Sequence, residues 1–258
     1  MKKLAFDKIF KRLGIKKNDI IFLSTNLLKL SIKKKKKKID FEIEDIINGL
    51  IKIIKKNGTI IVPVFNWNFC KGKGFHYKKT PSNSGSLGNY VLNRKDFLRT
   101  QNPIYSFCVY GKDKNLLSKL KHKSCFEFNS PFGYMIKNNV KNLYIDIDNI
   151  YKDSFTLCHV AEQEVGVNYR FLKKFRGKYV HKNISKKNAV YSMYVRKLNL
   201  KIRTGVNPKI KKDLIKKKSY FEKNINKINF KIVRMGEAYY IMKRSILNKG
   251  DIIFKDKL

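Results

Sequence analysis

His159 and Glu162 are the two residues whose types and spacing best fit a chemical role. They lie in the run SFTLCHVAE at residues 154–162, where Ser154 fits the N-cap of a helix. Residues three apart share one face of a helix, so the imidazole and the carboxylate would be neighbours. Such a pair can accept a proton from an attacking amine or hydroxyl group while the carboxylate steadies the imidazolium. The spacing alone favours a simpler interpretation, a surface ion pair worth a few tenths of a kcal/mol.

A second candidate is the run TPSNSGSLG at residues 80–88. Small residues let backbone N–H groups approach a ligand, and Ser86 is expected to cap a helix that starts near Leu87. This arrangement suits an anion such as a pyrophosphate, or an oxyanion, although an ordinary turn followed by a cap fits equally. Two shorter pieces are a turn entering a strand, NPIYSF at 102–107, and a turn opening a helix, SPFG at 130–133.

The remaining histidines and the cysteines give weaker signals. His76 lies in a long irregular segment, whereas His122 and His181 sit among lysines and are expected to be surface residues. The four cysteines contain no Cys-x-x-Cys pair, which argues against a metal framework and a disulfide scaffold. Cys158 is expected to be a small buried thiol.

The elements that must position these residues alternate between helices and strands. Helices are predicted over 4–13, with Gly14 ending the helix, and over 42–56, 113–120, 154–165, 210–224 and 237–247. Strands are predicted over 19–25, 58–65, 104–110, 142–148, 189–198, 228–234 and 250–254. The six consecutive lysines at 33–38 should repel one another and form a solvated loop.

This order predicts an α/β protein with a layered, mixed sheet. One domain covers 1–258, in which residues 1–177 hold most motifs and 178–258 form a smaller, Lys-rich C-terminal lobe that completes the sheet. The 43% hydrophobic residues are enough for a substantial core, and no window is apolar enough for a membrane span. The N-terminus lacks the apolar stretch of a signal peptide, so the expected compartment is the cytoplasm.

The formal net charge of +40 suggests an anionic partner. Lys outnumbers Arg by 50 to 9, however, and Arg is the residue that recognises phosphates and bases with a planar fork. Lys, Ile and Asn are all encoded by AT-rich codons, so mutational drift explains the lysines as well as selection does. No specific nucleic-acid partner is predicted; a non-enzymatic polyanion-binding protein remains an alternative.

Taken in order, the motifs resemble those of the aminoglycoside N3-acetyltransferase family. The matching motifs are DIIFLST (19–25), GTIIVPVF (58–65), PSNSG (81–85), RTQNPIYS (99–106), SPFG (130–133) and TLCHVAE (156–162). A weaker match is VRMGEA (233–238). The resemblance spans residues 15–250.

The resemblance implies a three-layer α/β/α sandwich and acyl transfer from an acyl-CoA thioester to an amine. It implies that His159, supported by Glu162, deprotonates this amine, with acetyl-CoA or another acyl-CoA as co-substrate and no metal. Ser24 and Thr25 match positions near the thioester, and the Thr25 hydroxyl or backbone N–H groups would hold the oxyanion. The positions matching the CoA channel are Pro81, Ser82, Gly85 and Ser106.

Two departures bear on the acceptor. Leu23 stands where many members carry His, and Asn89 stands where members commonly carry Glu. Aminoglycosides are polycations, and 19 acids against 59 bases make a poor pocket for them. The expected acceptor is therefore a nucleotide-linked amino sugar of surface-polysaccharide synthesis, with aminoglycoside 3-N-acetylation as the alternative. Oligomeric state stays open, a homo-oligomer included.

Overall fold

A mixed seven-stranded sheet forms the centre of the molecule, in the strand order β12-β13-β8-β2-β4-β7-β6. The computed structural model describes residues 2–150, 154–181, 184–200, 202–203, 206, 209–248 and 256–257. The sheet strands are β2 (Ile20–Thr25), β4 (Thr59–Pro63), β6 (Leu98–Arg99), β7 (Phe107–Gly111), β8 (Lys141–Ile145), β12 (Tyr220–Ile225) and β13 (Ile228–Arg234). The three central strands β8, β2 and β4 run parallel, and the strands on both sides are antiparallel to their neighbours.

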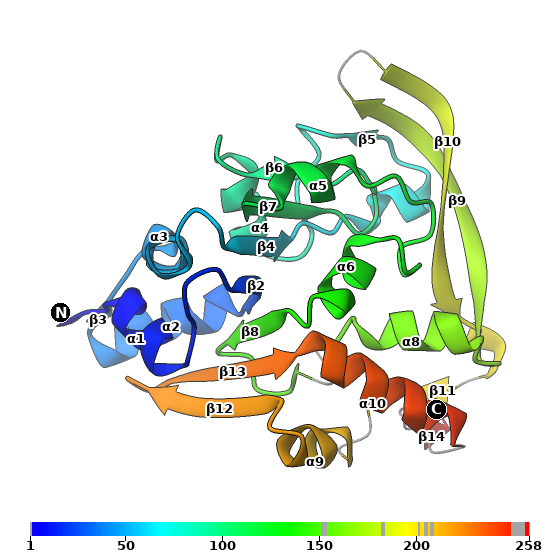
Figure 1. The fold of residues 1–258 in the computed structure, drawn as a ribbon. Helices are drawn as coiled ribbons and strands as arrows, with labels where there is room; N and C mark the ends of the chain where they lie inside the picture. The colour runs from blue at the N-terminus through cyan, green and yellow to red at the C-terminus, as the bar shows by residue number, and fades with distance from the viewer. Residues whose placement is uncertain are drawn as a thin grey trace.

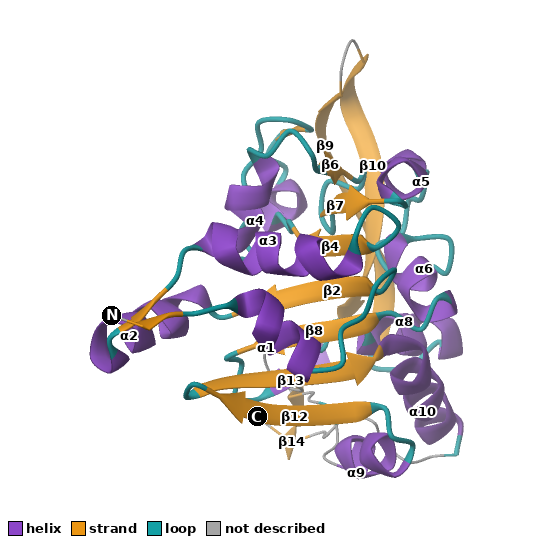
Figure 2. Ribbon diagram, turned by 60° about the vertical axis from the view of Figure 1, so that its left-hand side comes forward, coloured by secondary structure: helices purple, strands orange, loops and turns teal. Residues whose placement is uncertain are grey.

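Helices cover both faces of this sheet (Figure 2). One hydrophobic cluster joins the sheet to α1 (Phe6–Arg12), α2 (Leu27–Lys37), α3 (Ile43–Ile54) and α4 (Ser86–Leu92). A second cluster joins the opposite face to α5 (Lys114–Lys119), α6 (Pro131–Lys137), α8 (Cys158–Val165), α9 (Lys209–Lys216) and α10 (Met235–Leu247). Alternate side chains of a strand point to opposite faces, so a strand buried on both sides reads as a continuous apolar run. The predicted α/β/α sandwich with a mixed sheet is confirmed.

A long two-stranded arm rises from one side of the molecule, and its tip extends beyond the neighbouring elements (Figure 1). It consists of β9 (Arg170–His181) and β10 (Ile184–Arg196), and β5 (Phe75–His76) pairs with β9 to make a three-stranded sheet. The strand predicted over 189–198 corresponds to β10, whereas β9 was not predicted.

Short elements complete the described chain. They are the 3-10 helices η1 (Trp67–Lys71) and η2 (Leu198–Leu200), and the strand pairs β1 (Lys2–Lys3) with β3 (Ile39–Asp40) and β11 (Ile202–Arg203) with β14 (Asp256–Lys257). None of the described helices is long and apolar enough to cross a membrane.

The predicted loop at the lysine run is wrong, because residues 33–37 belong to α2. The Asn26 side chain accepts the Lys29 N–H and caps this helix, and Leu30 is fully buried. Lysines in its last turn lie at the negative end of the helix dipole. Lys33 also forms an ion pair with Asp146, so the repulsion expected from the sequence is offset by tertiary contacts.

Three expected helix boundaries differ from the structure. The helix predicted over 210–224 ends at Lys216, since residues 220–225 pair with β13 as a strand. Ser154 is not an N-cap, because α8 begins at Cys158 after Leu157. Ser86 is the first residue of α4, with Gly85 before it as the cap. The strand predicted over 250–254 lies outside the described residues.

Two predictions about single side chains have opposite outcomes. His122 is not a surface residue: it is 5% exposed, its Nδ1 lies 2.9 Å from the Ser124 carbonyl oxygen, and burial lowers its pKa. Cys158 is buried, as expected, and burial raises its pKa well above the ordinary value. The other three cysteines are also free thiols, and only Cys70 is partly exposed.

Candidate active site

The His159–Glu162 pair predicted from the spacing forms on α8. His159 Nδ1 lies 2.6 Å from Glu162 Oε2. The His159 side chain is 25% exposed, whereas Glu162 is fully buried. A surface ion pair would leave both groups in water, so the buried carboxylate rules out that simpler interpretation.

Two residues that follow α8 hold the Glu162 carboxylate. The Tyr169 hydroxyl donates to Oε1 at 3.0 Å, and Arg170 Nε lies 2.8 Å from Oε2. Burial alone would raise the pKa of Glu162, but the hydrogen bond and charge of His159, together with Arg170 and Tyr169, hold this pKa below its ordinary value. The carboxylate is therefore ionised and fixed in position at neutral pH.

The imidazole of His159 is oriented by its surroundings. Nδ1 faces Glu162 Oε2 and also lies 3.4 Å from Cys158 Sγ, and the Phe126 ring is 5.1 Å from the imidazole ring. Because an ionised carboxylate can only accept a hydrogen bond, Nδ1 of the neutral ring carries the hydrogen and donates it to Glu162, and the lone pair lies on Nε2. Nε2 has no partner within the described chain and is available to an incoming group.

Cys158, His159 and Glu162 also present three donor atoms within 4.8 Å of one another, a set that could hold a metal ion. Two features weigh against that use. His159 Nδ1 and Glu162 Oε2 already face each other at 2.6 Å. Arg170 already balances the charge of the Glu162 carboxylate.

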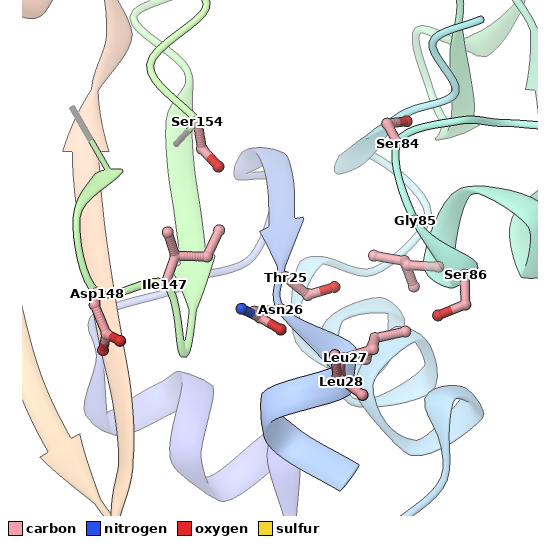
Figure 3. A pocket seen from close by; sticks show the side chains of 11 residues that line it. Thr25, Asn26, Leu27, Leu28, Ser84, Gly85, Ser86, Ile147, Asp148 and Ser154 are labelled. Carbon is pink, nitrogen blue, oxygen red and sulfur yellow. The ribbon is translucent and has the colours of Figure 1, made fainter. Parts of the chain in front are cut away.

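A pocket of about 340 Å³ opens at the carboxyl ends of β2 and β8 (Figure 3). Its lining is formed by residues 25–28, 84–87, 147–148 and 154. After β2 the chain passes through α3 to β4 on one side, and after β8 it continues to β13 on the other. Ligands commonly bind in such a crevice, where the connections that follow two neighbouring parallel strands lead to opposite sides of the sheet.

Small polar residues form the wall of the pocket opposite Asp148 (Figure 3). The Ser84 hydroxyl accepts the Phe65 N–H at 3.1 Å and donates to the Pro63 carbonyl oxygen, which ties the loop to the end of β4. Gly85 adopts φ +107°, a conformation that favours glycine. Ser154 lies four residues before the start of α8, and His159 itself is not among the residues that line this pocket.

The aminoglycoside 3-N-acetyltransferase profile matches residues 28–246, most of the chain. The protein belongs to this family. Its members are CoA-dependent N-acetyltransferases, and the protein is therefore classed as an N-acetyltransferase.

Solved structures of the family share the fold. AAC(3)-Xa superposes with a TM-score of 0.76 at 13% identity, covering 95% of this chain and 93% of that one. The AAC-IIIb complex with CoASH gives 0.77 at 12% identity over 96% and 98%. The YokD protein from Bacillus subtilis gives 0.72 at 17% identity over 95% and 98%. A search of curated protein sequences gives no match.

In this acetyltransferase, two of the residues assigned from the resemblance lie in the pocket, namely Thr25 and Gly85. Ser24 is buried, with its hydroxyl 3.5 Å from Asn142 Oδ1. The Ser106 hydroxyl is fully buried, donates to the Val64 carbonyl oxygen and accepts from Arg99 Nε. The structure thus places Ser106 behind the strand ends and not on the pocket lining.

Pro81 and Ser82 support the loop that carries Gly85. The Asn89 side chain accepts the Ser82 N–H at 2.8 Å and donates to its carbonyl oxygen at 3.2 Å. The Pro81 carbonyl oxygen accepts from the Asn66 side chain. Asn89 therefore holds the loop in this chain.

Sequence reasoning missed Tyr169 and Arg170. Arg170 is eight positions after Glu162 and lies at the start of β9, so no helical spacing links the two. Only a predicted strand at β9 could have indicated these contacts, because a strand that follows α8 can bring residues 169 and 170 back beside the helix.

Proposed function

We propose that the protein transfers an acetyl or related acyl group from acyl-CoA to the amine of an amino sugar, with His159 as the general base. The observation that carries this proposal is the arrangement around the imidazole. Its Nδ1 side is fixed by a buried, ionised Glu162, and its Nε2 has no hydrogen-bond partner among the described residues. A general base needs this combination of a defined tautomer and an accessible lone pair.

The reaction is a direct acyl transfer. The neutral amine attacks the thioester carbonyl carbon and forms the new C–N bond, while His159 Nε2 accepts the amine proton. The tetrahedral intermediate collapses with cleavage of the C–S bond, and the proton passes from the imidazolium to the departing CoA thiolate. Glu162 stabilises the imidazolium in between, since it is held by Tyr169 and Arg170.

We propose that the acyl-CoA binds in the pocket between β2 and β8. The small residues 84–86 suit the narrow pantetheine arm, and Thr25 would hold the developing oxyanion with its hydroxyl. Such a donor is worth about 10²–10³ in rate. Ser24, Pro81, Ser82, Gly85 and Ser106 would line or support this channel, as the resemblance implies.

The carboxylates on α8 and on the segment before α6 bear on the choice of acceptor. Glu162 is engaged by His159 and Arg170. Glu127 Oε1 accepts the N–H groups of Lys123 and Ser124, and Glu164 is paired with Lys243. A polycationic aminoglycoside requires uncommitted carboxylates, and these three are occupied. A nucleotide-linked amino sugar, which carries a diphosphate and belongs to cytoplasmic polysaccharide synthesis, fits the basic protein better.

His159→Ala tests the general base. We expect kcat to fall at least about 10²-fold, because proton transfer from the amine loses its acceptor. The affinity for CoA, measured by calorimetry, should stay within about twofold, since the imidazole makes no ground-state contact that holds the cofactor. His76→Ala, in β5, serves as the matched control and should retain activity. An unchanged kcat in His159→Ala would remove His159 from the mechanism.

The acceptor is tested separately with acetyl-CoA and two amines. We expect product from a dTDP-linked amino sugar and little from a kanamycin-like aminoglycoside. The opposite preference would establish the alternative, 3-N-acetylation of aminoglycosides, without affecting the role of His159.

A further inference from the structure

The sheet formed by β10, β9 and β5 carries an unusual concentration of positive charge. Ten lysine and arginine side chains are exposed on this sheet and on the segments immediately before and after β5. They are Lys71, Lys73, Lys78, Lys79, Lys173, Lys174, Arg176, Lys178, Lys186 and Lys187. Lys174, Arg176 and Lys178 alternate along β9, so they project from one face at steps of about 7 Å.

Acidic residues are absent from the sequence that builds this surface. Residues 46–95 contain no Asp or Glu, and neither do residues 166–212. The two stretches are far apart in the chain, but the pairing of β5 with β9 brings them together. Mutational drift toward lysine would add bases throughout the chain and does not explain why both acid-free stretches meet on one sheet.

Some lysines elsewhere in the molecule form ion pairs with carboxylates. Lys33 pairs with Asp146, Lys141 with Asp19 and Lys243 with Glu164. None of the ten basic residues of the arm surface forms an ion pair with a carboxylate of the described chain. Their charge is therefore directed outward, toward an external anion.

We propose that the β9–β10 arm docks the enzyme onto an anionic phospholipid membrane surface. Clusters of four to eight Lys or Arg residues bind anionic lipid headgroups, each contributing about fivefold in affinity. Ile184, beside the tip of the arm, is 55% exposed. An exposed apolar side chain beside lysines suits a surface that offers both phosphates and acyl chains.

The form of the arm favours a membrane over a nucleic acid. The tip extends beyond the body, so it can reach a flat surface without a clash from the helices (Figure 1). Proteins that bind single-stranded nucleic acid combine a basic groove with exposed aromatic platforms. Tyr179, Tyr191 and Tyr194 of the arm are instead buried, and Phe171, at the base, is the only exposed aromatic residue among those described on β9 and β10. Nine of the ten exposed cations are lysines, which act as point charges.

Vesicle flotation with the full-length protein tests this proposal. We expect binding to vesicles containing about one-third phosphatidylglycerol, weaker binding as NaCl rises from about 0.1 to 0.5 M, and none to pure phosphatidylcholine. The triple variant Lys174→Gln/Arg176→Gln/Lys178→Gln should bind about 100-fold more weakly. Its rate with soluble acyl-CoA and a soluble amine should be unchanged, which separates this result from the proposed catalysis.

A second triple variant with the same net charge provides the control. Lys16→Gln/Lys17→Gln/Lys56→Gln removes three exposed lysines from loops that precede β2 and β4 and should bind like the wild type. Equal losses in both triple variants would show that only total charge matters, and no loss in the first would exclude the arm. Displacement of the vesicles by an equal phosphate concentration of RNA would overturn the membrane assignment in favour of a nucleic acid.

Discussion

The carboxylate of Glu162 is fully buried and yet ionised, a state that proteins maintain only with several partners. Its three partners differ in kind: an imidazole, a phenol and a guanidinium. Each partner is fixed by a different element or turn, so the charge is tied to the correct packing of α8 against the start of β9. Catalysis and local stability therefore depend on the same group.

Glu162→Gln should make this dependence visible as a change with pH. Since the folded pKa is lowered below the ordinary value of 4.5, the ionised Glu162 stabilises the fold above that pH. This contribution is lost as the pH falls through the folded pKa. We expect the difference in unfolding free energy between wild type and Glu162→Gln, measured with urea, to be largest above about pH 4.5 and to shrink in more acidic solution. A difference that does not vary with pH would contradict this account.

At the scale of the element, α2 shows how a helix can form from a run of lysines. Its position depends on the contact between Lys33 and Asp146, whose side chain is fully buried. Asp146 Oδ2 has no hydrogen-bond partner among the described residues, and the Asp146 backbone adopts φ +57°, so Lys33 is the counter-charge of a strained position. The same helix begins at the pocket, which links the lysine run to the proposed CoA site.

Lys33→Met should destabilise the protein by about 3 kcal/mol, because it leaves a buried carboxylate without its counter-ion. Lys36→Met, on the same helix but exposed and outside the ion pairs of the described residues, should change stability by less than about 0.5 kcal/mol. Urea unfolding followed by circular dichroism measures both variants. Equal effects would show that the Lys33–Asp146 pair does not anchor the helix.

These elements also show what could be predicted from the sequence. β2 and β4 were predictable because strands buried on both faces leave continuous apolar runs. α2 and β9 were not predictable, since lysines dominate α2, five basic residues interrupt β9, and the stability of both comes from partners distant in sequence. For the same reason the His159–Glu162 pair could be found from local spacing, whereas Arg170 and the Asp148 side of the pocket could not.

For the whole molecule, the net charge of +40 predicts that salt stabilises the fold. Like charges repel one another in the compact state, and salt screens them over a Debye length of about 10 Å at 0.1 M. We expect the melting temperature to rise between about 0.02 and 0.3 M NaCl, by about 2–4 °C for each kcal/mol of repulsion removed. Choline chloride should act equally, which would exclude a specific sodium site. A constant or falling melting temperature would show that ion pairs outweigh the repulsion.

The burial of the cysteines has a practical consequence for enzymology. Burial raises the pKa of Cys70 to about 11 and that of Cys108 to about 12, and it raises those of Cys125 and Cys158 well above the ordinary value. Disulfide reagents react with thiolates. Because the pKa values of these thiols are raised, few of them are ionised in the native enzyme at neutral pH. A colorimetric disulfide reagent can therefore remain in the cuvette during turnover, where it reports the liberated coenzyme continuously and leaves the catalyst unmodified.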